Sequence, residues 1–386
     1  MAIDNLNVDI MSISKEAEEH KKKEKSVINA TLGVLLDENG TFVTIKSVDK
    51  ALEDVSKVKL REYFPQDGGS LYKENIYKYL FKNNLNKVSK NFHLTSNWSS
   101  GGSGALAMAF KMHEGVILIP NIAWPEYDQI ANNYNKKIKT YPLFKGDSFN
   151  LNGIDKILNK EKKNVLFVLN EPAHNPTGYT MDKKEYEEFF KIINKYNHVK
   201  LLVDIAYIDF SNNYFEMLIP LIIKYKINVI LTFSGSKSYL VYGVRMGLII
   251  YFATSKEAQD SFLKETKMIT TSTLGAPNSL SVLLLNEIVK SENLSAEQEA
   301  LKEILRLRSR LFITLAKENN IYLYPYKEGF FITVKCNNPE LLFKNLKKDM
   351  VYVIPTYKGI RISLSSINLK EIPTLIEKIK KHYEVC

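Results

Sequence analysis

The sequence predicts an α/β protein with a mostly parallel central sheet flanked by helices and with a smaller α+β domain beside it. Short apolar runs recur from about residue 116 to residue 252, and amphipathic helical patterns separate several of them. Nearly continuous apolar strands are typical of a sheet that is buried on both faces, and strands that alternate with helices are usually parallel. After about residue 290 this rhythm fades, which indicates a second unit of different architecture.

The elements of the first unit follow from these patterns in chain order. The charged run at residues 15–25 is typical of a solvated helix or arm. Residues 181–196 predict a helix, because Tyr186, Phe189 and Ile193 share one face at helical spacing. Five apolar runs predict strands at residues 116–120, 165–169, 201–204, 229–233 and 248–252.

The C-terminal part contains longer and more charged elements. A helix is predicted at residues 296–319, an alternating segment follows at 329–335, and a strand at 360–364 precedes a helix at 369–383. The predicted organisation is an N-terminal arm with part of the small domain in residues 1–44, a large domain in residues 45–290, and a C-terminal small domain in residues 291–386.

Composition excludes several classes of protein. The chain has 386 residues, of which 25% are charged and 45% hydrophobic, as in ordinary globular proteins. Its longest apolar runs, of about eight residues, are far shorter than the roughly 20 residues that span a bilayer. The N-terminus lacks the apolar run of a secretory signal. Cys336 and Cys386 cannot form a disulfide framework, so we expect a soluble cytoplasmic protein without a membrane partner.

The net charge of +10 raises the question of a nucleic-acid partner. Of the 53 basic residues, six are arginines and the other 47 are lysines, and no recognition motif or basic-aromatic stripe accompanies them. We therefore interpret the excess as a lysine-rich surface and expect no nucleic acid. A non-enzymatic, basic nucleic-acid-binding protein remains a distant alternative.

Polar side chains follow the predicted strands at the edge where open α/β sheets bind ligands. Residues 170–178 read N-E-P-A-H-N-P-T-G, Asp204 ends another strand, and residues 234–237 read S-G-S-K. A glycine-rich turn at residues 99–104 opens a helix, whose free N–H groups suit a phosphate. Each signal is weak alone, and the six scattered histidines give no support for a metal site.

The order and spacing of these signals are specific. Together they resemble the fold-type I, pyridoxal-phosphate-dependent class I aminotransferases, especially the aspartate aminotransferase branch. The motifs that carry the resemblance are, in chain order, the glycine-rich turn, Trp124, A-H-N-P-T-G, D-x-A-Y at residues 204–207, S-x-S-K and G-x-R-x-G at residues 243–247. Segments 28–40, 62–65 and 359–363 extend the resemblance nearly from end to end. It implies exchange of an amino group between an L-amino acid and a 2-oxo acid, with pyridoxal 5'-phosphate as cofactor.

The resemblance also implies roles at the reacting end of the cofactor. Lys237 matches the lysine that binds the cofactor covalently and then moves the α-proton. Asp204 is similar to the carboxylate that keeps the ring nitrogen protonated. Tyr207 and Asn175 match the pair that hydrogen-bonds the phenolic oxygen. Trp124 would stack on the ring and contact substrate, although a core tryptophan is a serious alternative.

Further roles concern the phosphate and the substrate. Arg361 resembles the arginine that binds the substrate α-carboxylate, together with Asn175 and the backbone at Gly33. Tyr63 would reach the phosphate of a neighbouring subunit, which implies a homodimer with shared active sites. The remaining phosphate ligands implied by the resemblance are Gly102, Ser103, Ser234 and Arg245.

The sequence also departs from the aspartate branch. That branch has a second arginine, lent by the partner subunit, for the substrate side-chain carboxylate. Residues 264–272 contain no arginine, and Lys267 would be a weak substitute. Tyr127 stands where a histidine is usual, and Thr31, Leu35 and Leu36 predict an apolar entrance. We therefore expect a neutral substrate, aromatic or aliphatic, rather than aspartate. A C–S or β-lyase or a racemase on the same scaffold remains the nearest alternative, because it would share Lys237 and Asp204.

Overall fold

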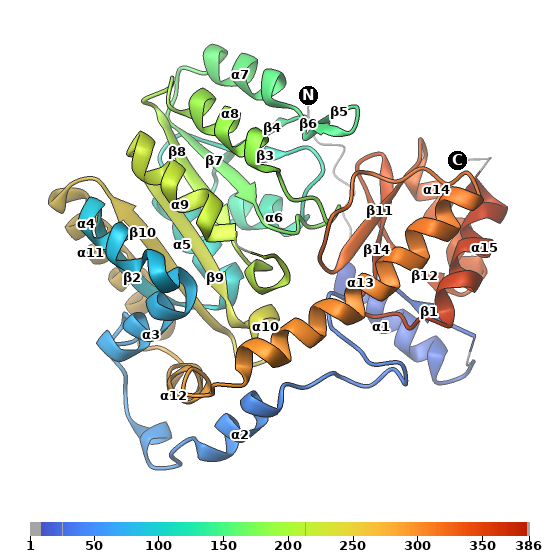
Figure 1. Ribbon diagram of the computed structural model, residues 1–386, viewed down its shortest axis with the longest axis horizontal. Coiled ribbons are helices and arrows are strands. Elements are labelled where there is room, and N and C mark those ends of the chain that lie inside the picture. Colours follow the sequence, from blue (N-terminus) through green and yellow to red (C-terminus); the bar gives the residue numbers. More distant parts are fainter. Residues whose placement is uncertain (1–8, 25, 213, 384–386) are drawn as a thin grey trace.

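The structure of the protein is a computed structural model that describes residues 9–24, 26–212 and 214–383. Cys386 and the first eight residues of the predicted N-terminal arm lie outside the described residues. Two unequal lobes are visible in Figure 1, and one long helix runs from the larger lobe to the smaller. None of the helices in the described ranges is long and apolar enough to cross a lipid bilayer.

The larger lobe is organised around one sheet. Its strands are β2 (His93–Ser100), β3 (Val116–Pro120), β4 (Lys137–Tyr141), β7 (Val165–Asn170), β8 (Val199–Asp204), β9 (Val229–Ser234) and β10 (Met246–Ala253). Within the described residues the strand order is β2-β10-β9-β8-β7-β3-β4. The run from β9 to β4 is parallel throughout, whereas β10 is antiparallel to both of its neighbours. The prediction of a mostly parallel sheet is confirmed.

Two strands of this sheet were missed by the sequence analysis. β2 contains polar residues inside the protein: Asn97 donates to Oγ1 of Thr270 at 2.8 Å, and Trp98 donates to Oγ of Ser281 at 2.9 Å. Such side chains tolerate burial because they are hydrogen-bonded, but they hide the apolar signal of a strand. β4 lies at the edge of the sheet and carries exposed lysines, so it lacks the continuous apolar run by which the other strands were predicted. Lysines on an edge strand are a common protection against pairing with the sheet of another molecule.

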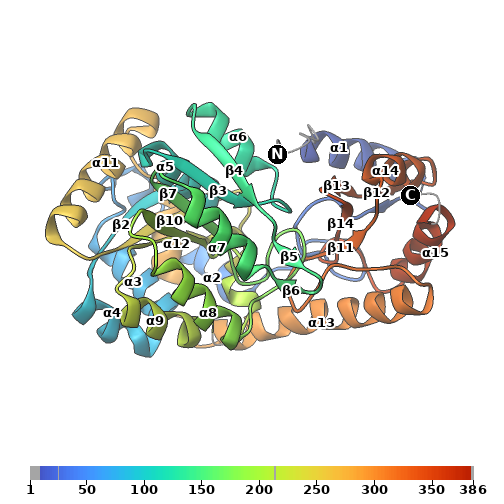
Figure 2. The ribbon, with the colours of Figure 1, turned by 90° about the horizontal axis from the view of Figure 1, so that it is seen from above.

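Helices cover both faces of the sheet, as Figure 2 shows from above. Alternate residues of the strands face opposite layers: Phe167 belongs to one apolar cluster, and its neighbours Leu166 and Val168 belong to another. The first face packs against α2 (Lys46–Asp54), α3 (Ser70–Phe81), α7 (Leu151–Lys160), α8 (Lys183–Ile193), α9 (Tyr214–Tyr225) and α12 (Ser279–Ile288). The second packs against α5 (Gly101–Met112), α6 (Glu126–Asn133) and α11 (Lys256–Leu274).

Shorter elements connect these layers. Helix α8 begins two residues later than predicted because Asp182 caps it, accepting from the backbone N–H of Glu185 at 2.9 Å. The connecting elements are α4 (Leu85–Asn91), α10 (Gly235–Ser238), β5 (Phe144–Lys145), β6 (Ser148–Phe149) and the 3₁₀ turns η1 (Lys59–Arg61), η2 (Lys82–Asn84) and η3 (Ile208–Phe210).

The smaller lobe combines both ends of the chain. Its elements are α1 (Ile10–Lys21), β1 (Ile28–Asn29), β11 (Phe331–Lys335), α14 (Pro339–Lys348), β12 (Val351–Tyr352), β13 (Ile354–Thr356), β14 (Gly359–Ser363) and α15 (Glu371–Tyr383). β1 pairs in parallel with β12, and β14 pairs with β11 and β13. Helix α1, predicted as a solvated helix or arm, also has a buried face that includes Ile10 and Ala17.

Helix α13 (Leu294–Glu318) joins the lobes, as Figure 1 shows. Leu301 and Leu305 in its first half pack in the core of the larger lobe. Phe312 and Ala316 in its second half pack in the core of the smaller lobe. The helix therefore contributes to both cores, and the division at residue 290 stays a prediction.

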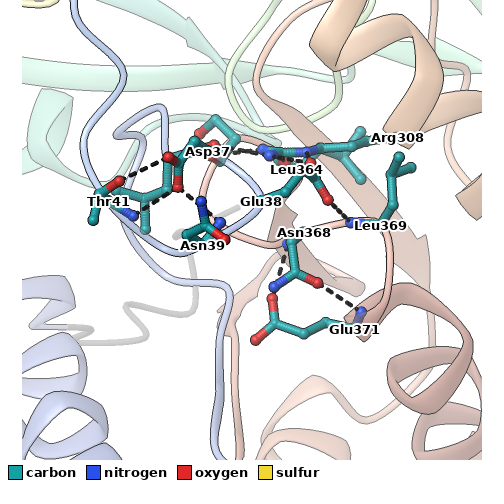
Figure 3. A network of polar contacts seen from close by, with 11 residues as sticks. Asp37, Glu38, Asn39, Thr41, Arg308, Leu364, Asn368, Leu369 and Glu371 are labelled. Atoms are coloured by element: carbon teal, nitrogen blue, oxygen red, sulfur yellow. Dashed lines mark hydrogen bonds and ion pairs between the residues drawn. The ribbon is translucent and has the colours of Figure 1, made fainter.

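Arg308 of α13 fixes this helix to two other segments (Figure 3). Its fully buried guanidinium donates to the carbonyl oxygens of Leu36 at 2.8 Å, Ser365 at 3.1 Å and Leu364 at 3.2 Å. It also pairs with Oε1 of Glu38 at 2.7 Å. These contacts give Arg308 a structural role.

We expect Arg308→Met to lower the free energy of unfolding by about 3 kcal/mol. The substitution leaves buried carbonyl oxygens without a donor, and each such loss costs roughly 1–3 kcal/mol. Urea unfolding followed by circular dichroism measures the change. Arg310→Met on the exposed side of the same helix is the matched control, and an equal loss in both variants would contradict this interpretation.

Candidate active site

A cavity of about 460 Å³ lies at the carboxyl ends of the central strands, where residues of both lobes meet. Of the predicted site residues, Tyr63 does not line it, and the side chain of Tyr63 is 94% exposed. The predicted residues that do line it are Gly33, Gly102, Ser103, Trp124, Asn175, Asp204, Tyr207, Ser234, Lys237, Arg245 and Arg361.

Lys237 lies in α10, directly after β9. Ser234 caps this short helix by accepting from the backbone N–H of Ser236 at 3.3 Å. The ammonium group of Lys237 donates to the carbonyl oxygen of Gly33. Burial, followed by the charges of Arg361 and Arg245, lowers the pKa of Lys237 to about 7. A large fraction of the side chain is therefore neutral, and hence nucleophilic, near neutral pH.

Close packing around Lys237 explains the glycine at position 33. A Cβ atom there would lie 2.6 Å from the Phe331 ring and 3.3 Å from Nζ of Lys237. A larger residue would displace either the ring or the lysine. Gly33 thus brings a backbone carbonyl of the smaller lobe into contact with the reactive amine of the larger lobe.

Asp204 ends β8 and is almost fully buried. Its Oδ2 accepts from the hydroxyl of Tyr127 at 2.7 Å, and its Oδ1 accepts from Thr232 and from the backbone N–H of Ala206, both at 3.3 Å. Burial raises the pKa of Asp204 to about 6, against the opposing effect of these hydrogen bonds. The carboxylate is therefore charged at neutral pH. Tyr127, which the sequence analysis noted as a departure, is its direct partner.

The glycine-rich turn forms the start of α5, as predicted, with Gly101 as the first helical residue. N–H groups in the first turn of a helix have no intrahelical acceptor. Gly101 has a φ of +69°, and a Cβ atom there would lie 2.7 Å from Nη2 of Arg245. Arg245 is held in turn by the carbonyl oxygen of Tyr242 at 3.0 Å. The turn and Arg245 thus form one end of the cavity that is rich in donors.

Arg361 is buried in β14. Its Nη2 donates to the carbonyl oxygen of Thr31 at 2.6 Å, and its Nη1 donates to Oδ1 of Asn175 at 3.2 Å. The guanidinium lies over the Phe331 ring, 4.3 Å from its centroid. Burial lowers the pKa of Arg361 to about 10, so the group stays charged at neutral pH. Its Nε has no hydrogen-bond partner among the described residues, which leaves donor capacity for a ligand.

Three further predicted residues lie at the same cavity. The backbone N–H of Asn175 is held by Oδ1 of Asn170 at 2.7 Å. Tyr207 packs against Phe330, at 5.4 Å between ring centroids, and burial raises the pKa of its hydroxyl above the usual value. Trp124 is only partly buried, and its ring meets Tyr127 edge-on, with an interplanar angle of 85°.

The predicted apolar entrance needs a correction. Leu35 is fully buried in the core of the larger lobe, and Thr31 uses its carbonyl oxygen to hold Arg361. Instead, Leu32 and Val34 line the cavity. Residues 31–35 form no regular strand, so their sequence alone does not show which side chains face the cavity.

Other lining residues were not named as site residues. Asn170, Ala206 and Ser236 lie within the motifs quoted above but were given no role, and nothing in the local sequence marks the rest. Ile10 and Met11 come from α1 and reach the cavity only through the packing of the smaller lobe. Lys267 pairs with Asp67 of its own chain at 3.3 Å and does not line this cavity, and its proposed role as a weak substitute in the site of a neighbouring subunit stays a prediction. The remaining missed residues are Val34, Leu106, Glu126, Asn170, Ala206, Ser236, Tyr242 and Phe331.

Comparison with known proteins gives consistent results. The family model described as "Aminotransferase class I and II" matches residues 25–379. The cytoplasmic aspartate aminotransferase of Schizosaccharomyces pombe is 25% identical over 316 residues, which cover 76% of each chain. A crystal structure of an aminotransferase from Anaerococcus prevotii has a TM-score of 0.87 at 23% identity and covers 99% of both chains.

A second solved structure is the aromatic-amino-acid aminotransferase of Burkholderia pseudomallei, covalently bound to pyridoxal phosphate. Its TM-score is 0.84 at 19% identity, and the match covers 97% of both chains. Both solved structures share the architecture described above, so the predicted fold class is confirmed.

Proposed function

The chain belongs to the aminotransferase class I and II family, and on this premise we propose that it uses pyridoxal 5'-phosphate, held by Lys237, to exchange an amino group between a neutral L-amino acid and a 2-oxo acid. Amino-group transfer is the activity of the family. The cofactor, the residue roles and the substrate class are the parts that we propose for this chain.

The cavity fits this cofactor at three points. A phosphate suits the donor-rich end, where the start of α5, Ser234 and Arg245 converge. The hydroxyl of Ser236 is buried there without a partner among the described residues. The buried carboxylate of Asp204 can bind a protonated ring nitrogen. The amine of Lys237, whose pKa is lowered, can react with an aldehyde.

The chemistry divides between the cofactor and the chain. When bound, the pyridoxal ring supplies an electron sink for the loss of the α-proton of the substrate. Lys237 accepts and returns that proton at Nζ, for which a pKa near the working pH is favourable. The carboxylate of Asp204 would stabilise the positive charge of a protonated ring nitrogen. Tyr207 and Asn175 would hydrogen-bond the phenolic oxygen of the ring.

Substrate binding is assigned to the smaller lobe and to Trp124. Arg361 presents a planar guanidinium that can bind a carboxylate bidentately. The backbone at Gly33 lies beside it, at the amine of Lys237. Leu32 and Val34 add apolar surface, which supports a neutral aromatic or aliphatic side chain rather than that of aspartate.

The observation that carries this proposal is the meeting of Lys237, Asp204 and Arg361 at one cavity. A test incubates the purified protein and cofactor with a panel of L-amino acids, with and without common 2-oxo acids. We expect new amino acid formed from the acceptor, in a 1:1 ratio with the oxo acid produced. Acceptor-independent release of pyruvate or ammonia would instead support a lyase, and racemised substrate would support a racemase.

We expect Arg361→Lys to raise the KM for the amino acid by roughly 10–100-fold, with a smaller change in kcat. Lysine keeps the charge but loses the fork of two parallel donors, and a hydrogen bond to a charged group is worth about 1.5–3 kcal/mol. Steady-state kinetics measure the effect. Arg306→Lys, on the exposed side of α13, is the control, and an unchanged KM in Arg361→Lys would remove Arg361 from the substrate site.

The same proposal includes a homodimer with shared active sites in the cytoplasm. Tyr63 is exposed and does not line the cavity of its own chain, which supports a role in a neighbouring subunit. Sedimentation equilibrium tests the dimer. Support for the cytoplasm comes from the low cysteine content and from the relative in Schizosaccharomyces pombe, which is named as cytoplasmic.

A further inference from the structure

Glu126 is an acidic residue of the cavity to which the proposed chemistry assigns no role. It is the first residue of α6 and lines the cavity beside Trp124 and Tyr127. Its Oε2 is buried and has no hydrogen-bond partner among the described residues. Burial raises the pKa of this carboxyl group, while the charge of Arg361 acts in the opposite direction. A carboxyl oxygen without a partner is costly to bury, so a ligand that donates to it would be stabilised.

A purely structural role explains only part of this arrangement. Acidic side chains are favourable in the first turn of a helix, and Asp128 occupies the same turn of α6. The backbone N–H of Glu126 itself satisfies part of its carboxyl group. Asp128 does not line the cavity, whereas Glu126 does, and the buried Oε2 remains unpaired.

The other lining residues of the cavity indicate which substrate side chains can bind beside Glu126. Besides Arg361, the smaller lobe contributes the apolar side chains of Ile10, Met11, Leu32 and Val34 to the lining of the same cavity. Among the described lining residues the positive charges are those of Lys237, Arg245 and Arg361, which the proposed function assigns to the cofactor and to the α-carboxylate. Within one chain, none of these charges is left to pair with a second carboxylate on the substrate, and Glu126 would repel that carboxylate.

We propose that Glu126 is a specificity-determining residue, which accepts a hydrogen bond from an N–H or O–H group at the end of the substrate side chain and disfavours side chains that end in a carboxylate. This inference rests on the proposed function and narrows its substrate class. Such a substrate combines an apolar stem, for the wall formed by Leu32 and Val34, with a donor at its tip. A site built to hydrogen-bond such a group discriminates strongly against an analogue without it.

The test compares two pairs of amino acids with closely similar shapes: glutamine with glutamate, and tyrosine with phenylalanine. The measured quantity is the ratio of kcat/KM for the donor-ended member to that for its partner, in the pair with the highest turnover. We expect a ratio above one in the wild type and a decrease of about tenfold or more in Glu126→Gln, mainly through KM. Asp128→Asn is the matched control and should leave the ratio unchanged.

Two safeguards keep this inference separate from the proposed function. Glu126→Met serves as a second variant if Glu126→Gln does not fold, and calorimetric binding of the same pairs gives the affinity ratio even without turnover. If the wild type transfers no amino group, the proposed function fails, and the affinity ratios still decide on Glu126. A wild-type ratio of one or less, or a ratio that stays unchanged in Glu126→Met, which has no oxygen acceptor, would overturn the inference.

Discussion

Replacement of Lys237 by alanine is expected to lower kcat by about 10²–10⁴-fold, the usual contribution of a positioned acid–base group, and to abolish covalent cofactor binding. Lys237 has a pKa of about 7 and is the one lysine that lines the cavity among the described residues. Lys237 is therefore the amine that this chain offers to the substrate α-carbon at the cavity. Stopped-flow and steady-state kinetics with saturating cofactor measure the loss.

Lys200→Ala is the control for this variant. Lys200 is also partly buried, and burial lowers its pKa as well, but it lies near the start of β8, away from the cavity. It should keep wild-type kcat and cofactor absorbance. Retention of a reducible covalent link in Lys237→Ala would show that another lysine binds the cofactor and would refute the site.

The second large effect is expected for Asp204→Asn, which should lower kcat by roughly 10²–10³-fold, as the loss of a buried electrostatic partner does in other active sites. The amide keeps the shape of the side chain but carries no negative charge to stabilise a protonated ring nitrogen. Steady-state kinetics, together with the affinity for the cofactor, separate lost chemistry from lost binding. An Asp204→Asn enzyme with normal kcat would contradict the role of this carboxylate.

Tyr127→Phe gives a graded version of the same test. The hydroxyl of Tyr127 lowers the pKa of Asp204, so its removal raises that pKa further above the ordinary value. Asp204 acts as a carboxylate, and the charged form is lost as the pH falls through its pKa. We therefore expect the acid limb of the kcat–pH profile to move to higher pH in Tyr127→Phe. A profile that stays in place or moves to lower pH would contradict this coupling.

The parts of the fold that followed from sequence are those with an uninterrupted local signal. The apolar strands β7, β8 and β9 and the glycine-rich start of α5 were predicted because their own residues are sufficient to indicate them. β2 was missed because its buried face is polar and is satisfied by Thr270 and Ser281, which are distant in the sequence. Such pairing depends on tertiary contacts that a local pattern does not contain.

The residues that line the cavity also divide into those with a local sequence signal and those placed by tertiary packing. Asp204 and Lys237 were noted because each follows a predicted strand at the edge where open α/β sheets bind ligands, and the resemblance to the aminotransferases implied their roles. Ile10 and Leu32 were not selected, because they reach the cavity only when the smaller lobe packs against the larger one. Glu126 follows Pro125 at a helix start and looks like an ordinary first-turn acid until its burial is known.

The most direct test of the central claim identifies the residue that holds the cofactor. Wild-type protein is incubated with pyridoxal 5'-phosphate, reduced with borohydride, digested and analysed by mass spectrometry. The predicted result is a single modified peptide that carries the reduced cofactor on Lys237, with loss of the visible absorbance band. A stable modification on a different lysine, or no modification at all, would contradict the assignment of Lys237 and the active site built around it.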